Sequence, residues 1–250
     1  MIRIFRAEWI KIIHARSFWS MLCTYGFIYS VCVYAFAKFF ASLTVNGGSI
    51  GTAIMNGPQA WAAIAWVGHW LSFLLGFTVI QLVCNEFEFR TNKQNIIDGY
   101  SPAEYYAGKI MLVLGVSILA SLLYIVIAAI SAGAYFAGEV VAAFTLACVG
   151  TLSLALIFAF FARRAGPAGF LFLAYPVILE PIINYLLSGN SATGMSQFLP
   201  AEAFSRLTPF PVSQSQWGGD LNFAHNSLIA VCVVIGLWSL SYLAFSYSDR

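Results

Sequence analysis

The stretch 110–132, IMLVLGVSILASLLYIVIAAISA, decides the fold of this chain, because it is apolar almost throughout and contains no charged residue. A hydrocarbon core about 30 Å thick is crossed by roughly 20 such residues in helical form. Lipid offers the backbone no hydrogen-bond partner, and the apolar pattern is continuous rather than alternating, which favours a helix over a barrel strand. The stretch therefore predicts a membrane-spanning α-helix.

Five other stretches have similar length and character. The six predicted spans are residues 18–41, 61–84, 110–132, 140–162, 168–187 and 227–247. Of the 250 residues, 60% are hydrophobic and 9% are charged, whereas about a quarter of a soluble domain is charged. This composition excludes a soluble globule. It predicts an all-α, polytopic membrane protein in which residues 1–250 form one transmembrane domain.

The basic residues predict how the spans are oriented. Cytoplasmic loops retain an excess of lysine and arginine, and all but two of the 12 lie on one side of the predicted spans. We therefore expect both termini in the cytoplasm and residues 188–226 outside, as in a multi-pass protein of a bacterial inner (plasma) membrane. The cytoplasmic set is Arg3, Arg6, Lys11, Arg16, Arg90, Lys93, Lys109, Arg163, Arg164 and Arg250, whereas Lys38 and Arg206 lie opposite.

Residues 1–17 precede the first span and show amphipathic spacing. At helical periodicity their apolar side chains share one face, and basic side chains lie on the other. This pattern predicts a helix lying on the inner leaflet, attracted to anionic headgroups. A positively charged flank that only sets the topology is the alternative, and both can hold together. The predicted membrane-surface residues are Arg3, Arg6, Trp9 and Lys11.

Charge is concentrated in residues 85–104, after the second predicted span. Nothing in residues 85–98 breaks a helix, and Gly99 is a natural C-terminal stop. Ser101, Pro102 and Glu104 then combine an N-cap serine, a proline at the first helical position and the glutamate of a capping box. A short cytoplasmic helix, a turn and the start of the third span are expected. The alternative is a solvated connector without a binding role.

The run NEFEFRTNKQNIIDGYSPAEYYAGK, residues 85–109, resembles the segment after the second span in ABC-2 type transporter permeases. The matching features are an acidic residue, a threonine, a Ser-Pro step and a Gly-Lys pair before the third span. Arg90 departs from the family, in which many members have glycine before the threonine. The resemblance implies a coupling helix that docks on an ATPase through Glu86, Glu88, Arg90, Thr91, Lys93, Gln94 and Asp98.

The same resemblance implies the partners. The chain has no G-x-x-x-x-G-K-[ST] phosphate loop, so ATP and Mg²⁺ are expected in a separate cytoplasmic ABC ATPase subunit. This chain is then a permease subunit and not an enzyme, and it binds no cofactor itself. A second permease copy or a paralogue would complete the translocation unit in the lipid bilayer. Export is favoured, and the sequence does not identify the substrate.

Glu180 is the acidic residue predicted to lie inside a span, between Pro176 and Pro181. Such a group is costly unless it is paired, protonated or hydrated, and the prolines should kink or interrupt the helix. Glu180 and Asn184 are therefore predicted to line an outward cavity of a transport pathway. Alternatively, Glu180 lies near the outer interface and caps a broken helix. His69 is read as a packing residue rather than a proton relay.

Two other functions stay open at this point. A proton-coupled secondary transporter would use Glu180 in its broken helix. A non-transporting membrane anchor or assembly partner would use the charged segment only for docking. The net charge of +2 is too small to indicate nucleic-acid binding, and no spacing of cysteine, histidine or acidic residues indicates a metal site.

Overall fold

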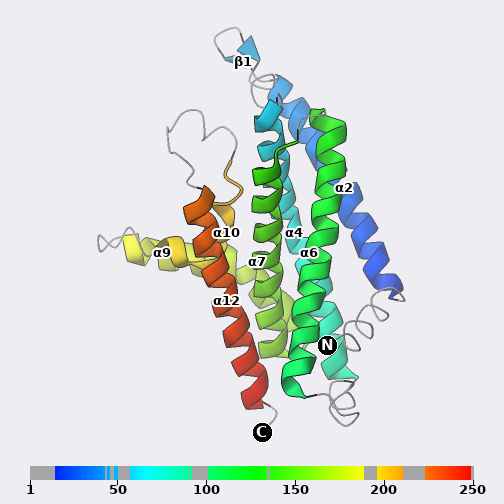
Figure 1. Cartoon of the computed structure of the whole chain (residues 1–250), viewed down its shortest axis with the longest axis vertical. Coiled ribbons are helices and arrows are strands. Elements are labelled where there is room, and N and C mark those ends of the chain that lie inside the picture. The colour runs from blue at the N-terminus through cyan, green and yellow to red at the C-terminus, as the bar shows by residue number, and fades with distance from the viewer. Residues whose placement is uncertain are drawn as a thin grey trace.

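The computed structural model is a bundle of helices that run along one long axis (Figure 1). It describes residues 15–42, 44–45, 48–49, 57–89, 91, 101–133, 136–188, 196–210 and 223–248. Within these ranges, six helices are long and apolar enough to cross a membrane, which confirms the predicted number. They are α2 (Arg16–Ser42), α4 (Gly57–Glu88), α6 (Pro102–Ala132), α7 (Gly138–Ala162), the broken helix Ala165–Leu186 and α12 (Phe223–Ser248).

The fifth of these helices is broken near its middle. α8 (Ala165–Ala174) continues into the π-helical turn η1 (Tyr175–Leu179) and then into α9 (Glu180–Ser188). Pro176 and Pro181 cannot donate the backbone hydrogen bonds of an α-helix, so the ladder is interrupted and widens locally. α9 runs crosswise to the long axis of the bundle in Figure 1. The predicted interruption of this span is confirmed.

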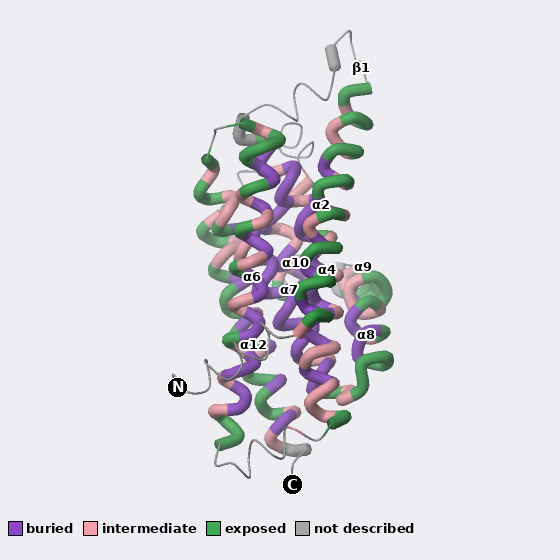
Figure 2. The backbone as a smooth tube through the Cα atoms, turned by 90° about the vertical axis from the view of Figure 1, so that its right-hand side faces the viewer, coloured by how far each residue is buried: buried purple, intermediate pink, exposed green. Residues whose placement is uncertain are grey.

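The centre of the bundle is formed by α4 and α7. α7 contacts α4, α6, α8, α12 and the short helix α10 (Pro200–Ser205), which follows the 3-10 turn η2 (Ser196–Phe198). Within the most apolar windows, 67% of the residues of α4 and α7 are buried, against 22% for α2. Figure 2 shows this difference as buried inner helices beside an α2 that is largely exposed. An exposed apolar surface of this kind suits lipid contact.

Two glycines allow close approach inside the bundle. A Cβ atom on Gly68 of α4 would lie 2.3 Å from the Tyr29 hydroxyl of α2. A Cβ on Gly150 of α7 would lie 2.3 Å from the ring of Phe204 in α10. These positions therefore require the absence of a side chain, so that α2 and α10 can pack directly against the central pair.

Two details of the structure differ from the expectation. Residues 85–88 continue α4 to Glu88, whereas a separate helix was expected to begin at residue 85. The remainder of that expected helix, except Phe89 and Thr91, lies outside the described residues. A short antiparallel hairpin of β1 (Thr44–Val45) and β2 (Gly48–Ser49) follows α2. Its two-residue strands were not expected from the sequence.

Candidate functional site

The predicted coupling segment is attached to the bundle by a buried ion pair between α4 and α6. Lys109 Nζ lies 2.7 Å from Glu86 Oε1, and the two side chains are 2% and 13% exposed. The Tyr105 hydroxyl donates a 2.8 Å hydrogen bond to Glu86 Oε2. Lys109 Nζ also lies 4.9 Å from the centre of the Tyr105 ring, within the range of a cation–π contact. Both oxygens of Glu86 are thus engaged inside the chain.

The start of α6 is held by the predicted capping box. Ser101 Oγ accepts from the Glu104 backbone N–H at 3.2 Å, and Glu104 Oε2 accepts from the Ser101 backbone N–H at 2.9 Å. Pro102 occupies the first turn, where its missing N–H costs nothing. This local arrangement ends the charged segment at a defined point and directs α6 into the bundle.

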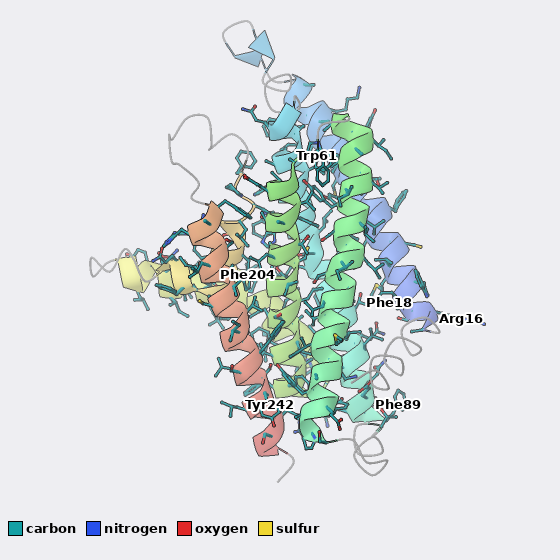
Figure 3. The ribbon with its side chains drawn as sticks, viewed as in Figure 1. Arg16, Phe18, Trp61, Phe89, Phe204 and Tyr242 are labelled. Atoms are coloured by element: carbon teal, nitrogen blue, oxygen red, sulfur yellow. The ribbon has the colours of Figure 1, made fainter. Side chains whose placement is uncertain are left out.

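Aromatic contacts connect this end of α4 and α6 to two other helices. Tyr105 stacks on Phe245 of α12 with ring centres 5.3 Å apart. Phe87 meets Phe160 of α7 at 5.8 Å, and the Arg163 guanidinium lies 5.2 Å from the Phe87 ring centre. The ends of α4, α6, α7 and α12 therefore form one packed unit, which we call the charged end. Figure 3 shows Phe89 and Tyr242 at this end and Trp61 near the other.

The described coupling residues differ in their surroundings. Glu88 is exposed, Thr91 is half-buried and its hydroxyl donates to the Glu86 carbonyl at 3.3 Å, and Glu86 belongs to the ion pair. Of these three, Glu88 is the most accessible to a partner. Two groups of predicted residues lie outside the described part of the chain. They are Arg90, Lys93, Gln94 and Asp98 of the coupling segment, and Arg3, Arg6, Trp9 and Lys11 of the membrane-surface helix.

Glu180 and Asn184 line the same cavity, which has a volume of about 260 Å³. Its walls come from α4, from η1 and α9, and from α10. Glu180 is only 4% exposed. The geometry thus places the two predicted pathway residues side by side around one space, which we call the α4–α9 cavity. Its lining residues are His69, Trp70, Phe73, Pro176, Glu180, Pro181, Asn184, Ala201, Glu202 and Ser205.

Glu180 also caps α10. Its Oε2 accepts from the Ala201 backbone N–H at 2.9 Å, and its Oε1 accepts from the Glu202 backbone N–H at 2.5 Å. The residue at the N-cap of α10, Leu199, has no side-chain oxygen, so Glu180 supplies the cap from α9. Glu180 therefore lines the cavity and caps α10, and not its own interrupted helix as the alternative interpretation expected.

The sequence reasoning missed two pairings. His69 is 5% exposed and lines the same cavity as Glu180, although the two are far apart in the chain. The Glu86–Lys109 pair was also missed. Its signal was present, since an acidic residue ending one span and a lysine beginning the next face each other when consecutive helices run antiparallel.

No protein-family model matches the sequence, and no curated protein matches it. The resemblance to ABC-2 permeases therefore stays a prediction. Among the described residues, no group of three or more histidine, cysteine or acidic side chains could hold a metal ion.

Proposed function

We propose that this chain is the membrane-spanning permease subunit of an ABC transporter of the ABC-2 type. A separate cytoplasmic ATPase subunit would bind ATP and Mg²⁺, and a second permease copy or paralogue would complete the pathway. Export across a bacterial inner membrane is the favoured direction. The six apolar helices supply the membrane domain, and the segment between α4 and α6 supplies the docking site.

Sidedness is supported by where the described cations lie. Lys109, Arg163 and Arg164 belong to the ends of α6 and α7 that adjoin the end of α4, and α12 also ends there (Figure 1). Cytoplasmic surfaces carry the excess of such residues. The charged end is thus the cytoplasmic end in this proposal, and both termini lie on that side.

The attachment of the coupling segment is the observation that carries the proposal. An ATPase that pushes on residues 85–104 acts on α4 directly. Through the Glu86–Lys109 pair and Tyr105 it acts on α6, and through Phe245 on α12. A packed, hydrogen-bonded unit transmits displacement as a rigid body rather than absorbing it. The charged end therefore has the construction that coupling to an external motor requires.

Affinity purification of the tagged chain from its native cells, with mass spectrometry of associated proteins, tests this function. Glu88→Lys reverses an exposed charge at the charged end and leaves Glu86 intact, so the bundle should fold. The matched control is Glu139→Lys, since Glu139 is exposed in the first turn of α7, at the opposite end. We expect a soluble ABC ATPase with wild type and Glu139→Lys, and its loss with Glu88→Lys.

Recovery of no ATPase from well-folded wild type would refute the proposal. The second candidate function, proton-coupled secondary transport, would then be favoured, because Glu180 and His69 line one cavity and both can exchange protons. If the ATPase is still recovered with Glu88→Lys, it docks on a surface that does not include Glu88. Reconstitution of the chain with its ATPase partner distinguishes a non-transporting anchor. Such an anchor would not stimulate ATP hydrolysis by that partner.

A further inference from the structure

The walls of the α4–α9 cavity are brought together by the break in the fifth helix. α9 turns away from the bundle after η1, and Glu180 at its start holds α10 through two backbone hydrogen bonds. Phe204 of α10 in turn packs against Gly150 of α7. The cavity is thus bounded by α9 and α10 on one side and by one face of α4 on the other.

The described lining of the cavity contains two acidic side chains and no basic one. Glu180 and Glu202 both contribute to it, and none of the lining residues that the structure describes is a lysine or arginine. Backbone N–H groups are neutral donors, so the bonds that Glu180 accepts stabilise its charge without cancelling it. Glu202 Oε1 pairs with Arg206 Nε at 2.9 Å, whereas the described lining contains no cationic side chain for the carboxylate of Glu180.

The lining also offers an acceptor and aromatic surfaces. His69 Nδ1 is buried and has no hydrogen-bond partner among the described residues, and a neutral imidazole keeps one nitrogen as an acceptor. Trp70 and Phe73 lie on the same wall, where their rings stack at 6.2 Å. Indole and phenyl faces attract cations. Carboxylate, imidazole and aromatic rings together form a set that suits a protonated amine.

We propose that the α4–α9 cavity binds the protonated amine group of an organic ligand. The ammonium contacts Glu180 and donates a hydrogen bond to the imidazole of His69. Trp70 and Phe73 cover the apolar part of the ligand. The cavity volume of about 260 Å³ holds more than a single water-sized group. This inference deepens the proposed function, since it makes the transported substrate an organic cation.

Binding to the purified full chain in detergent tests the proposal without requiring an ATPase. The probes are 2-phenylethylammonium, 2-phenylethanol and phenylacetate, which share one carbon skeleton and differ in charge. We expect the ammonium probe to bind at least about tenfold more tightly than the neutral probe by calorimetry, with no binding of the anion. Equal affinities for all three probes, or displacement of the ammonium probe by an equal concentration of K⁺, would overturn the proposal.

Variants locate the binding. Glu180→Gln and Trp70→Leu should each weaken binding of the ammonium probe about tenfold, whereas Glu139→Gln, an acidic residue outside this cavity, should leave it unchanged. Trp70 is 53% exposed, so Trp70→Leu should fold even if Glu180→Gln loosens α10. Unchanged affinity in folded Trp70→Leu overturns the assignment. Amine binding without any associated ATPase would support this site while refuting the permease role, so the two failures are distinguishable.

Discussion

Glu86→Ala is expected to destabilise the bundle strongly, because it leaves Lys109 buried without its counter-charge. The Lys109 residue is 1% exposed, and its ammonium lies 2.7 Å from Glu86 Oε1. Removing one member of a buried ion pair costs about 3–5 kcal/mol. The Tyr105 hydroxyl loses its acceptor as well. We therefore place the expected loss in the upper part of that range.

The measurement is unfolding of the purified chain by SDS in mixed micelles, followed by circular dichroism. The control is Glu88→Ala, which removes the same charge two residues further along α4 at an exposed site and should change the unfolding free energy by less than about 0.5 kcal/mol. Glu86→Ala/Lys109→Met removes both charges and should recover most of the stability, giving a large coupling in the double-mutant cycle.

The reasoning fails if Glu86→Ala costs no more than Glu88→Ala, or if the two changes at Glu86 and Lys109 are additive. The result also bears on docking experiments. A loss of ATPase binding in Glu86→Ala would reflect a disturbed charged end as readily as a lost contact, whereas Glu88→Lys separates docking from folding.

Three smaller perturbations follow from local packing. Gly150→Ala should destabilise the chain, since its Cβ would lie 2.3 Å from the Phe204 ring. Adding Phe204→Ala should relieve that clash in the double variant. A Gly150→Ala variant as stable as wild type would contradict this packing. Gly236→Ala in α12 meets nothing within 4 Å and should be neutral or stabilise the helix by up to about 1 kcal/mol in the same unfolding assay. Ser101→Ala removes the cap that pairs with Glu104 and should cost about 1 kcal/mol, whereas Ser101→Asp should retain most of it.

Some of this structure follows from local sequence signals. The six spans are recognisable because each is a long apolar run, and the α6 start is recognisable because Ser101, Pro102 and Glu104 act within one turn. The break at η1 follows from Pro176 and Pro181, which remove specific backbone donors. These features depend on residues close together in the chain, so no tertiary information was needed.

The candidate sites depend on tertiary contacts and were less accessible. When a helix is apolar on every face, its sequence does not indicate which face packs against which neighbouring helix. No local sequence pattern therefore predicted that His69 would share a cavity with Glu180. The extension of α4 to Glu88 brings Glu86 against Lys109 of α6, a contact that an apolar-run boundary at residue 84 does not register. The sequence did not indicate how each helix is rotated about its own axis or which helices pack against each other.

α4 connects the two proposed sites. Glu86 lies at its charged end and His69 in the wall of the α4–α9 cavity, and at 1.5 Å per residue they are about 25 Å apart along the helix. The opposite wall, Glu180 with α10, is anchored to α7 through Phe204 and Gly150. A displacement of the packed unit of α4, α6, α7 and α12 relative to α9 would therefore change the cavity. Because binding linkage is reciprocal, an ATPase that alters amine affinity by a given factor must itself bind with an affinity altered by the same factor when the amine is present.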